Sequence, residues 1–132
     1  MLFRSRARRI WRAVVVDRSM EPALRPGDRL LVLPAGPNGL PWLRGAPRAG
    51  SVVIVEREGR FDVKRVGGIT GGALWLLGDN AAASSDSRAS GPVPLHALRG
   101  IVVWRSGPHG RRGRIPKLGA GTSVSPMGRR TN

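Results

Sequence analysis

The 132-residue sequence contains no cysteine and no tyrosine, and it has only two phenylalanines. Without cysteine it cannot form disulfides, thiolate nucleophiles or thiolate metal sites. The absence of cysteine is compatible with either an oxidising or a reducing compartment. With so few aromatic rings, it offers little for nucleic-acid bases to stack on. Uninterrupted apolar runs such as residues 13–16 and 30–33 are far shorter than the roughly 20 residues that span a bilayer. A positive N-terminus without a following apolar stretch does not make a signal peptide. We therefore expect a cytoplasmic protein that at most touches a membrane peripherally.

Charge of one sign is also scarce, because 8 acidic residues stand against 23 basic ones and the formal net charge is +15. Such a balance favours nonspecific attraction to polyanions and anionic membranes. Much of the charge lies in the two flanks, and no arginine stripe is interleaved with aromatics, so we expect no specific nucleic-acid partner. The acidic residues are dispersed, and His96 and His109 are the only histidines. The sequence therefore predicts no metal site and no cofactor.

The strand-like patterns are concentrated in one stretch of the chain. β-branched or alternating apolar runs predict strands at residues 11–17, 29–33, 51–56, 60–66, 73–77 and 100–105. Glu58 and Gly59 separate two of these runs and predict a hairpin. We divide the chain into a basic segment (1–12), a mainly β catalytic domain (13–105) and a basic, disordered tail (106–132). No helix is expected in the core.

Two Pro- and Gly-rich stretches, residues 34–50 and 78–94, are predicted to be long loops. The first contains an apolar cluster at residues 40–43. We expect these side chains to fold back on the core, and the alternative is a lip that contacts substrate or a membrane. Oligomeric state is not indicated by any pattern in the chain.

Lysine is scarcer still than the aromatic residues, since only Lys64 and Lys117 are found among the basic residues. Arginine stays protonated, whereas a desolvated lysine can lose its proton and act as a base. Lys64 lies in the predicted strand 60–66 between valines, and Ser19 precedes the turn-rich residues 25–28. A serine nucleophile with a neutral lysine base is an alternative to the Ser-His-Asp arrangement. Singly, each residue is more often a turn serine or a solvated lysine, but together they form the main catalytic hypothesis.

Three blocks in order strengthen that hypothesis. They are SMEPAL (19–24) leading to PGD (26–28), then VKRV (63–66), then GDN (78–80) followed by SSDSR (84–88) and GPVP (91–94). In this order they resemble the type I signal peptidase family of serine-lysine endopeptidases, over residues 16–104. The resemblance implies a partly open antiparallel β-barrel, shared with self-cleaving repressors, with a groove for an extended peptide.

The resemblance also assigns roles to individual residues. Ser19 matches the nucleophile and Lys64 the general base, with the backbone N–H of Ser19 as the expected oxyanion donor. Ser84 matches a serine that orients the lysine amine, and Met20 matches a position that shapes the turn beside the nucleophile. Further supporting residues are expected to form ion pairs beneath the site: Asp79, Asp86 and Arg88.

The chain departs from the family at Asp17, because many members have Gly or Ser two residues before the nucleophile. An inward-pointing carboxylate there would repel an oxyanion, which leaves the second oxyanion donor open. The sequence also shows neither a membrane span before Ser19 nor a large insertion after Lys64.

Size and the missing span make the chain most similar to the nickel-type superoxide dismutase maturation proteases. That resemblance implies removal of an N-terminal propeptide from a soluble precursor of nickel superoxide dismutase. One alternative is a signal peptidase at a membrane surface, held there by the basic N-terminus and residues 40–43. Another is a Ser-Lys self-cleaving regulator, although only about 18 residues precede Ser19.

Overall fold

The computed structural model describes residues 9–108 and 110–117. Short 3₁₀ turns and a single helical turn connect the strands. The strands are β1 (Trp11–Val14), β2 (Arg29–Pro34), β3 (Val52–Arg57), β4 (Arg60–Thr70), β5 (Ala73–Leu77), β6 (Val93–Pro94), β7 (Leu98–Ser106) and β8 (Arg112–Gly113). The helical turns are η1 (Pro41–Leu43), η2 (Ala81–Ala83), α1 (Ser87–Ser90) and η3 (Leu95–Ala97).

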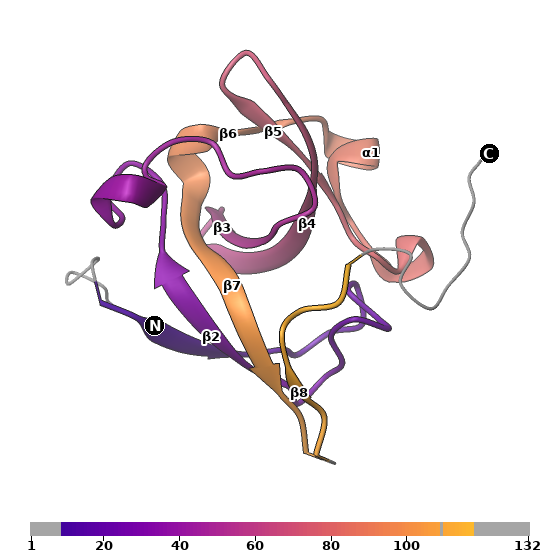
Figure 1. The fold of residues 1–132 in the computed structure, drawn as a ribbon. Coiled ribbons are helices and arrows are strands. Elements are labelled where there is room, and N and C mark those ends of the chain that lie inside the picture. The colour runs from indigo at the N-terminus through magenta and orange to yellow at the C-terminus, as the bar shows by residue number, and fades with distance from the viewer. Residues whose placement is uncertain (1–8, 109, 118–132) are drawn as a thin grey trace.

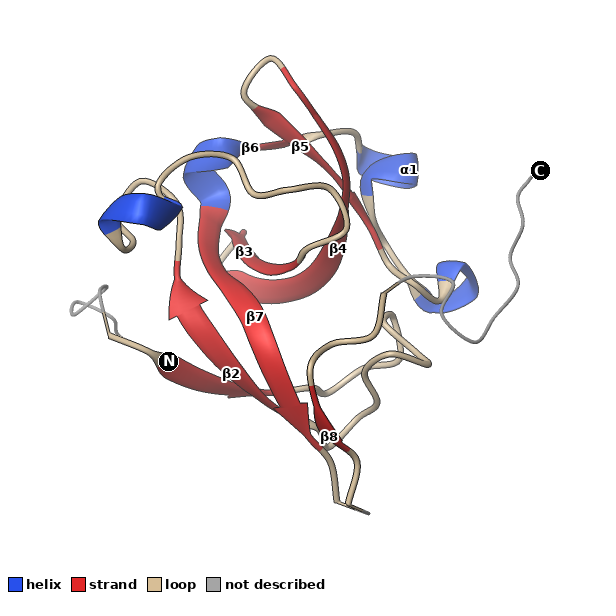
Figure 2. Cartoon of the chain, viewed as in Figure 1, coloured by secondary structure: helices blue, strands red, loops and turns tan. Residues whose placement is uncertain are grey.

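All the described strands belong to one antiparallel sheet with the order β1-β2-β7-β3-β4-β5-β6, and β8 is attached to β7. Within the described residues the two end strands, β1 and β6, do not pair with each other, so the sheet is not closed. The sheet curls so strongly that β4 wraps around β3 and β7, while the short helices lie at the periphery (Figures 1 and 2). The predicted mainly β, partly open antiparallel architecture is thereby confirmed.

The curl gives the protein two apolar clusters that share strand β3. Val52 and Ile54 point into the first cluster, which also contains Met20 and Leu24. Val53 and Val55 point into the second cluster. Because side chains alternate along a strand, four consecutive buried residues are possible only where both faces are covered. Both faces of β3 are covered by the curled sheet, so β3 is a continuous apolar run rather than an alternating one.

The hairpin between β3 and β4 forms where the sequence predicts it. Arg57 pairs with Arg60, and the two turn residues both have positive φ, 53° at Glu58 and 78° at Gly59. Consecutive positive φ angles are typical of the tight two-residue hairpin turn. The turn fixes the register of β4 on β3 and places Lys64 opposite Val53.

The loop 34–50 contains η1, and within it the side chains of the apolar cluster 40–43 face different surroundings. Leu43 packs against the second core cluster, as expected, whereas Trp42 is 74% exposed. The expectation that the whole cluster folds back on the core is therefore wrong for Trp42. A 3₁₀ turn places neighbouring side chains on different sides, so one of two adjacent residues faces the solvent.

Residues 107–108 and 110–117 pack against the rest of the protein, which differs from the expectation of disorder for this part of the predicted tail (106–132). β8 pairs with the end of β7, Ile115 packs against the first core cluster, and Arg65 Nη2 donates to the Pro116 carbonyl at 2.9 Å. These long-range contacts order a segment whose composition alone is typical of disorder. Residues 118–132 lie outside the described part of the chain.

Candidate active site

Ser19 lies on a loop, residues 15–28, that is closed at its base by backbone hydrogen bonds. The N–H of Val15 donates to the Asp28 carbonyl at 2.9 Å, and the N–H of Gly27 donates to the Val15 carbonyl at 2.8 Å. Met20 and Leu24, with exposed fractions of 1% and 0%, anchor the loop in the first core cluster. Ser19 itself is buried. The loop thus presents Ser19 from a fixed base, and Met20 acts as its apolar anchor.

The block GDN holds this loop from the other side. The N–H of Asn80 donates to the Ser19 carbonyl at 2.8 Å, and Asn80 Nδ2 donates to the Arg18 carbonyl at 3.1 Å. In Figure 1 the purple loop accordingly lies beside the turn that follows β5. The third sequence block therefore contacts the first, and Asn80 is a contact residue that the sequence reasoning did not single out.

Lys64 is buried in β4, with an exposed fraction of 5%. Its pairing partner Val53 and the nearby Val66 belong to the second core cluster. Within residues 9–108 and 110–117, Lys64 forms no ion pair. Asp62, which shares its face, is instead held by Arg57 at 3.3 Å. Lys64 is therefore a buried residue beside apolar side chains, and no ion pair with a carboxylate is found for it among the described residues.

The β4–β5 register relates Lys64 to Gly78, a glycine that Ser84 and the Ser19 carbonyl approach closely. Arg65 pairs with Leu77, so the next position along the two strands sets Lys64 opposite Gly78. A Cβ placed on Gly78 would lie 2.1 Å from Ser84 Oγ and 2.8 Å from the Ser19 carbonyl oxygen. Directly opposed Cβ positions are about 5 Å apart and share a face of the sheet, so this register sets the Lys64 stem on the same face as the space at Gly78 that Ser84 Oγ and the Ser19 carbonyl approach. The missing side chain of Gly78 makes this convergence possible.

Asp17 binds both donor groups of Ser19. Its Oδ1 accepts the Ser19 hydroxyl at 2.9 Å and the Ser19 backbone N–H at 3.0 Å. No hydrogen bond joins Ser19 to Lys64 in the part of the chain that the structure describes. The carboxylate two residues before the serine therefore points towards the candidate nucleophile, and the hydroxyl proton is engaged by Asp17.

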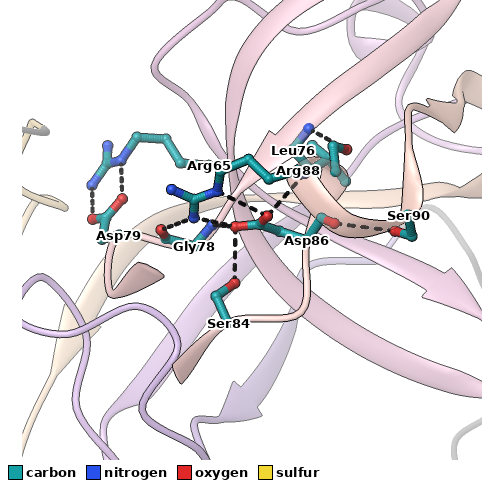
Figure 3. Close-up of polar contacts among 9 residues, drawn as sticks. Arg65, Leu76, Gly78, Asp79, Ser84, Asp86, Arg88 and Ser90 are labelled. Atoms are coloured by element: carbon teal, nitrogen blue, oxygen red, sulfur yellow. Dashed lines mark hydrogen bonds and ion pairs between the residues drawn. The ribbon is translucent and has the colours of Figure 1, made fainter. Parts of the chain in front are cut away.

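Asp86 is the centre of a polar network beneath the site (Figure 3). Its carboxylate accepts the N–H of Gly78 at 2.7 Å, the Ser84 hydroxyl at 3.1 Å and the N–H of Arg88 at 3.0 Å, and it also pairs with the Arg88 guanidinium. The hydrogen bond from the Arg88 guanidinium holds the pKa of Asp86 well below its usual range, against the opposing effect of burial. The bonded N–H groups of Gly78 and Arg88 and the Ser84 hydroxyl lower that pKa further. Asp86 thus fixes Ser84 and also caps α1.

Asp79 pairs with Arg65, whereas Arg88 pairs with Asp86. Asp79 and Arg65 are joined by two hydrogen bonds of 2.9 and 2.7 Å, and both side chains are nearly inaccessible, with exposed fractions of 4% and 3%. Figure 3 shows the two groups facing each other. Arg65 directly follows Lys64, so this pair ties the candidate base strand to the GDN turn. Sequence reasoning expected the ion pairs but missed Arg65, although it stands in the same motif as Lys64.

A second buried carboxylate supports the loop of Ser19. Asp28 is fully buried and accepts Arg111 Nη1 at 3.0 Å on both oxygens. Arg111 and Arg105 also donate to the Ala23 carbonyl. The segment after β7 therefore stabilises the turn that follows Ser19. Arg111 lies 83 positions from Asp28, and no local pattern in the sequence indicates such a contact.

Comparisons with known proteins agree with the family resemblance over part of the chain. Residues 64–106 match the family model "Signal peptidase, peptidase S26". A segment of 38 residues is 50% identical to the mitochondrial inner membrane protease subunit 1 of Schizosaccharomyces pombe. That segment covers 29% of this chain and 24% of the relative. The family match begins at Lys64 and includes Ser84, Asp86 and Arg88, but it does not extend to Ser19. Both matches are to peptidases. No helix among the described residues is long and apolar enough to cross a membrane.

Proposed function

We propose that this chain is a serine endopeptidase in which Ser19 is the nucleophile and Lys64 is the general base. The observation that carries the proposal is the arrangement at Gly78: Ser84 Oγ and the Ser19 carbonyl approach this glycine, and the strand register continued by one position sets Lys64 opposite it. Ser19 and Lys64 are both buried, and the match to signal peptidases begins at Lys64. A turn serine and a solvated surface lysine would not be expected to converge in this way.

The proposed reaction uses one proton acceptor in both half-reactions. Ser19 Oγ bonds to the scissile carbonyl carbon while its proton moves to Lys64 Nζ. The C–N bond then breaks, and the leaving amine takes that proton. A water molecule then bonds to the acyl carbon while its proton passes to Lys64 Nζ, the bond from that carbon to Ser19 Oγ breaks, and the proton returns to Ser19 Oγ. An amine accepts a proton only in its neutral form, so the proposed reaction begins with Lys64 Nζ neutral. The Ser19 N–H stabilises the oxyanion, and Ser84, fixed by Asp86, orients the amine.

We further propose that the substrate is a precursor protein with an N-terminal propeptide, namely the precursor of nickel superoxide dismutase. This substrate is supported by the sequence resemblance alone. The removed segment is expected to bind as an added strand along a sheet edge, where backbone hydrogen bonds supply affinity. Nickel belongs to the product of the reaction and not to this chain. A cytoplasmic location goes with a soluble precursor of this kind.

The direct test is cleavage of that precursor, read by mass spectrometry. The wild type is expected to release one N-terminal fragment, and Ser19→Ala and Lys64→Ala are expected to release none. Ser85→Ala and Lys117→Ala are matched controls, because both residues are exposed, and they should cleave like the wild type. Cleavage that survives both Ser19→Ala and Lys64→Ala would refute the dyad. Cleavage of a signal peptide but not of this precursor would retain the dyad and replace the substrate.

Trp42 favours a second candidate function, a signal peptidase that works at a membrane surface. Its indole is 74% exposed at η1, and tryptophan is enriched at the interface between lipid and water. Exposed arginines at positions 44 and 48 follow it. In a liposome flotation assay this function predicts binding to neutral as well as anionic vesicles, reduced in Trp42→Ala. Binding to anionic vesicles alone, with no effect of Trp42→Ala, would indicate only general electrostatic attraction.

A further inference from the structure

The carboxylate of Asp17 lies beside Ser19 but takes no part in the proposed mechanism. Its Oδ1 accepts both the hydroxyl and the backbone N–H of Ser19, at 2.9 and 3.0 Å. In the proposed reaction both donors must be released from Asp17, because the hydroxyl proton moves to Lys64 and the N–H donates to the oxyanion. One oxygen of Asp17 therefore occupies the position where the substrate oxyanion must bind.

Charge makes this contact unproductive for catalysis. An oxyanion hole accelerates acyl transfer because its donors are free and directed at the developing negative charge. An anionic carboxylate on the same N–H both occupies the donor and repels the oxyanion. A carboxylate is also a much weaker base than a neutral amine, so its hold on the Ser19 proton does not substitute for Lys64.

The loop can lose the Asp17 contact without losing its shape. The Ser19 carbonyl is held by the N–H of Asn80 at 2.8 Å, and the neighbouring Met20 is buried in the core. Asp17 itself is exposed, and within residues 9–108 and 110–117 it forms no ion pair. A change of the Asp17 side-chain rotamer is sufficient to release both donors of Ser19 while the backbone stays in place.

We propose that Asp17 is an autoinhibitory latch on Ser19, which the substrate carbonyl displaces when it enters the site. This inference rests on the proposed function, because it assumes that Ser19 is the nucleophile. It implies a resting enzyme with low reactivity towards small acylating reagents. A bound peptide strand supplies the interactions that offset the loss of the Asp17 contact, so the latch selects extended substrates over small esters.

The test is the rate of Ser19 acylation by p-nitrophenyl acetate, followed by peptide mapping with mass spectrometry. In this reaction the acetyl carbon bonds to Ser19 Oγ, p-nitrophenolate leaves, and the hydroxyl proton goes to Lys64. The full chain is compared as wild type, Asp17→Ala, Asp17→Asn and Lys64→Ala, with Ser19→Ala as the mapping control. Unfolding by urea for each variant shows that the fold is retained.

Asp17→Ala is expected to acylate about tenfold faster than the wild type, which corresponds to one charge-assisted hydrogen bond at the low end of its range. Asp17→Asn retains an acceptor oxygen without the charge, so its acylation rate is expected to lie between those of the wild type and Asp17→Ala. The same variants should change the acylation rate by less when an extended peptide ester replaces p-nitrophenyl acetate. A purely structural role of Asp17 would lower the rates for both esters together.

The outcomes separate the latch from the dyad. Acylation that is lost in Lys64→Ala but is equal or slower in both folded Asp17 variants overturns the latch and leaves the proposed function standing. A slower Asp17→Ala with retained stability would make Asp17 a proton acceptor instead. Acylation that is unaffected by Lys64→Ala overturns the dyad, whatever Asp17 does. Failure of Ser19 to react in every variant would overturn both proposals.

Discussion

Gly78→Ala tests the claim that a missing side chain lets the catalytic segments converge. An added Cβ would lie 2.1 Å from Ser84 Oγ, 2.4 Å from Ser84 Cβ and 2.8 Å from the Ser19 carbonyl oxygen. All three distances are shorter than van der Waals contact, and one of the atoms belongs to the backbone. Either Ser84 moves off Asp86, or the Ser19 loop moves off Asn80.

The expected cost combines overpacking with the loss of about one hydrogen bond. Overpacking costs about 1–3 kcal/mol and a hydrogen bond about 1 kcal/mol, so the free energy of unfolding should fall by about 3 kcal/mol. For a chain of this size the melting temperature should fall by roughly 12 °C. If Ser19 is the nucleophile as proposed, moving its loop should lower the turnover of a cleaved substrate roughly 100-fold.

Gly68→Ala is the matched control on the neighbouring strand. A Cβ on Gly68 meets no atom within 4 Å, so its free energy of unfolding should change by less than about 0.5 kcal/mol. Urea unfolding and thermal melting measure both variants, and precursor cleavage measures their activity. Adding Ser84→Gly to Gly78→Ala removes the two closest contacts, so the double variant should recover part of the lost stability. A Gly78→Ala variant as stable and as active as Gly68→Ala would show that Ser84 and the Ser19 loop do not need the missing side chain of Gly78.

Three further predictions concern the ion pairs. Asp79→Asn leaves Arg65 buried without a carboxylate, so the free energy of unfolding should fall by about 3–5 kcal/mol in urea titrations. A fall of less than about 1 kcal/mol, as for an exposed ion pair, would show that water reaches Arg65. The lowered pKa of Asp86 contributes stability that is fully present above the pKa of the unfolded chain, about 3.9, and is lost as the pH falls towards the folded value. Urea titrations between about pH 5 and pH 2 should therefore show falling stability in the wild type. In Arg88→Gln the fall should be shallower, because Arg88 is the largest cause of the shift; an equal slope in both proteins would assign the acid sensitivity to other carboxylates.

Much of the fold could be predicted because its signals are local. The apolar runs of β3 and β4 and the turn residues Glu58 and Gly59 define a hairpin without reference to the rest of the chain. The two-residue strands β6 and β8 carry no such signal, since their strand geometry depends on pairing with β5 and β7. Composition also placed residues 106–117 in a tail, because arginine, glycine and proline are typical of disorder wherever no long-range partner is known.

The candidate site could be predicted only as far as its motifs extend. Ser19 and Lys64 stand out by residue type and order, and their pairing in catalysis remains a prediction. The contacts that place them depend on residues far away in the sequence, such as Asn80 against the loop and Arg111 against Asp28. The orientation of Asp17 also required the structure, because a carboxylate at an exposed turn can point either way.

The tie between Asp28 and Arg111 has a consequence for the order of events during synthesis. The loop of Ser19 leaves the ribosome early, but its buried carboxylate has no guanidinium partner until position 111 has emerged. The Pro116 carbonyl that accepts Arg65 arrives later still. The nascent chain therefore lacks both supporting contacts until residues 111–116 have been made, and the proposed site is completed only after the sheet strands that precede them.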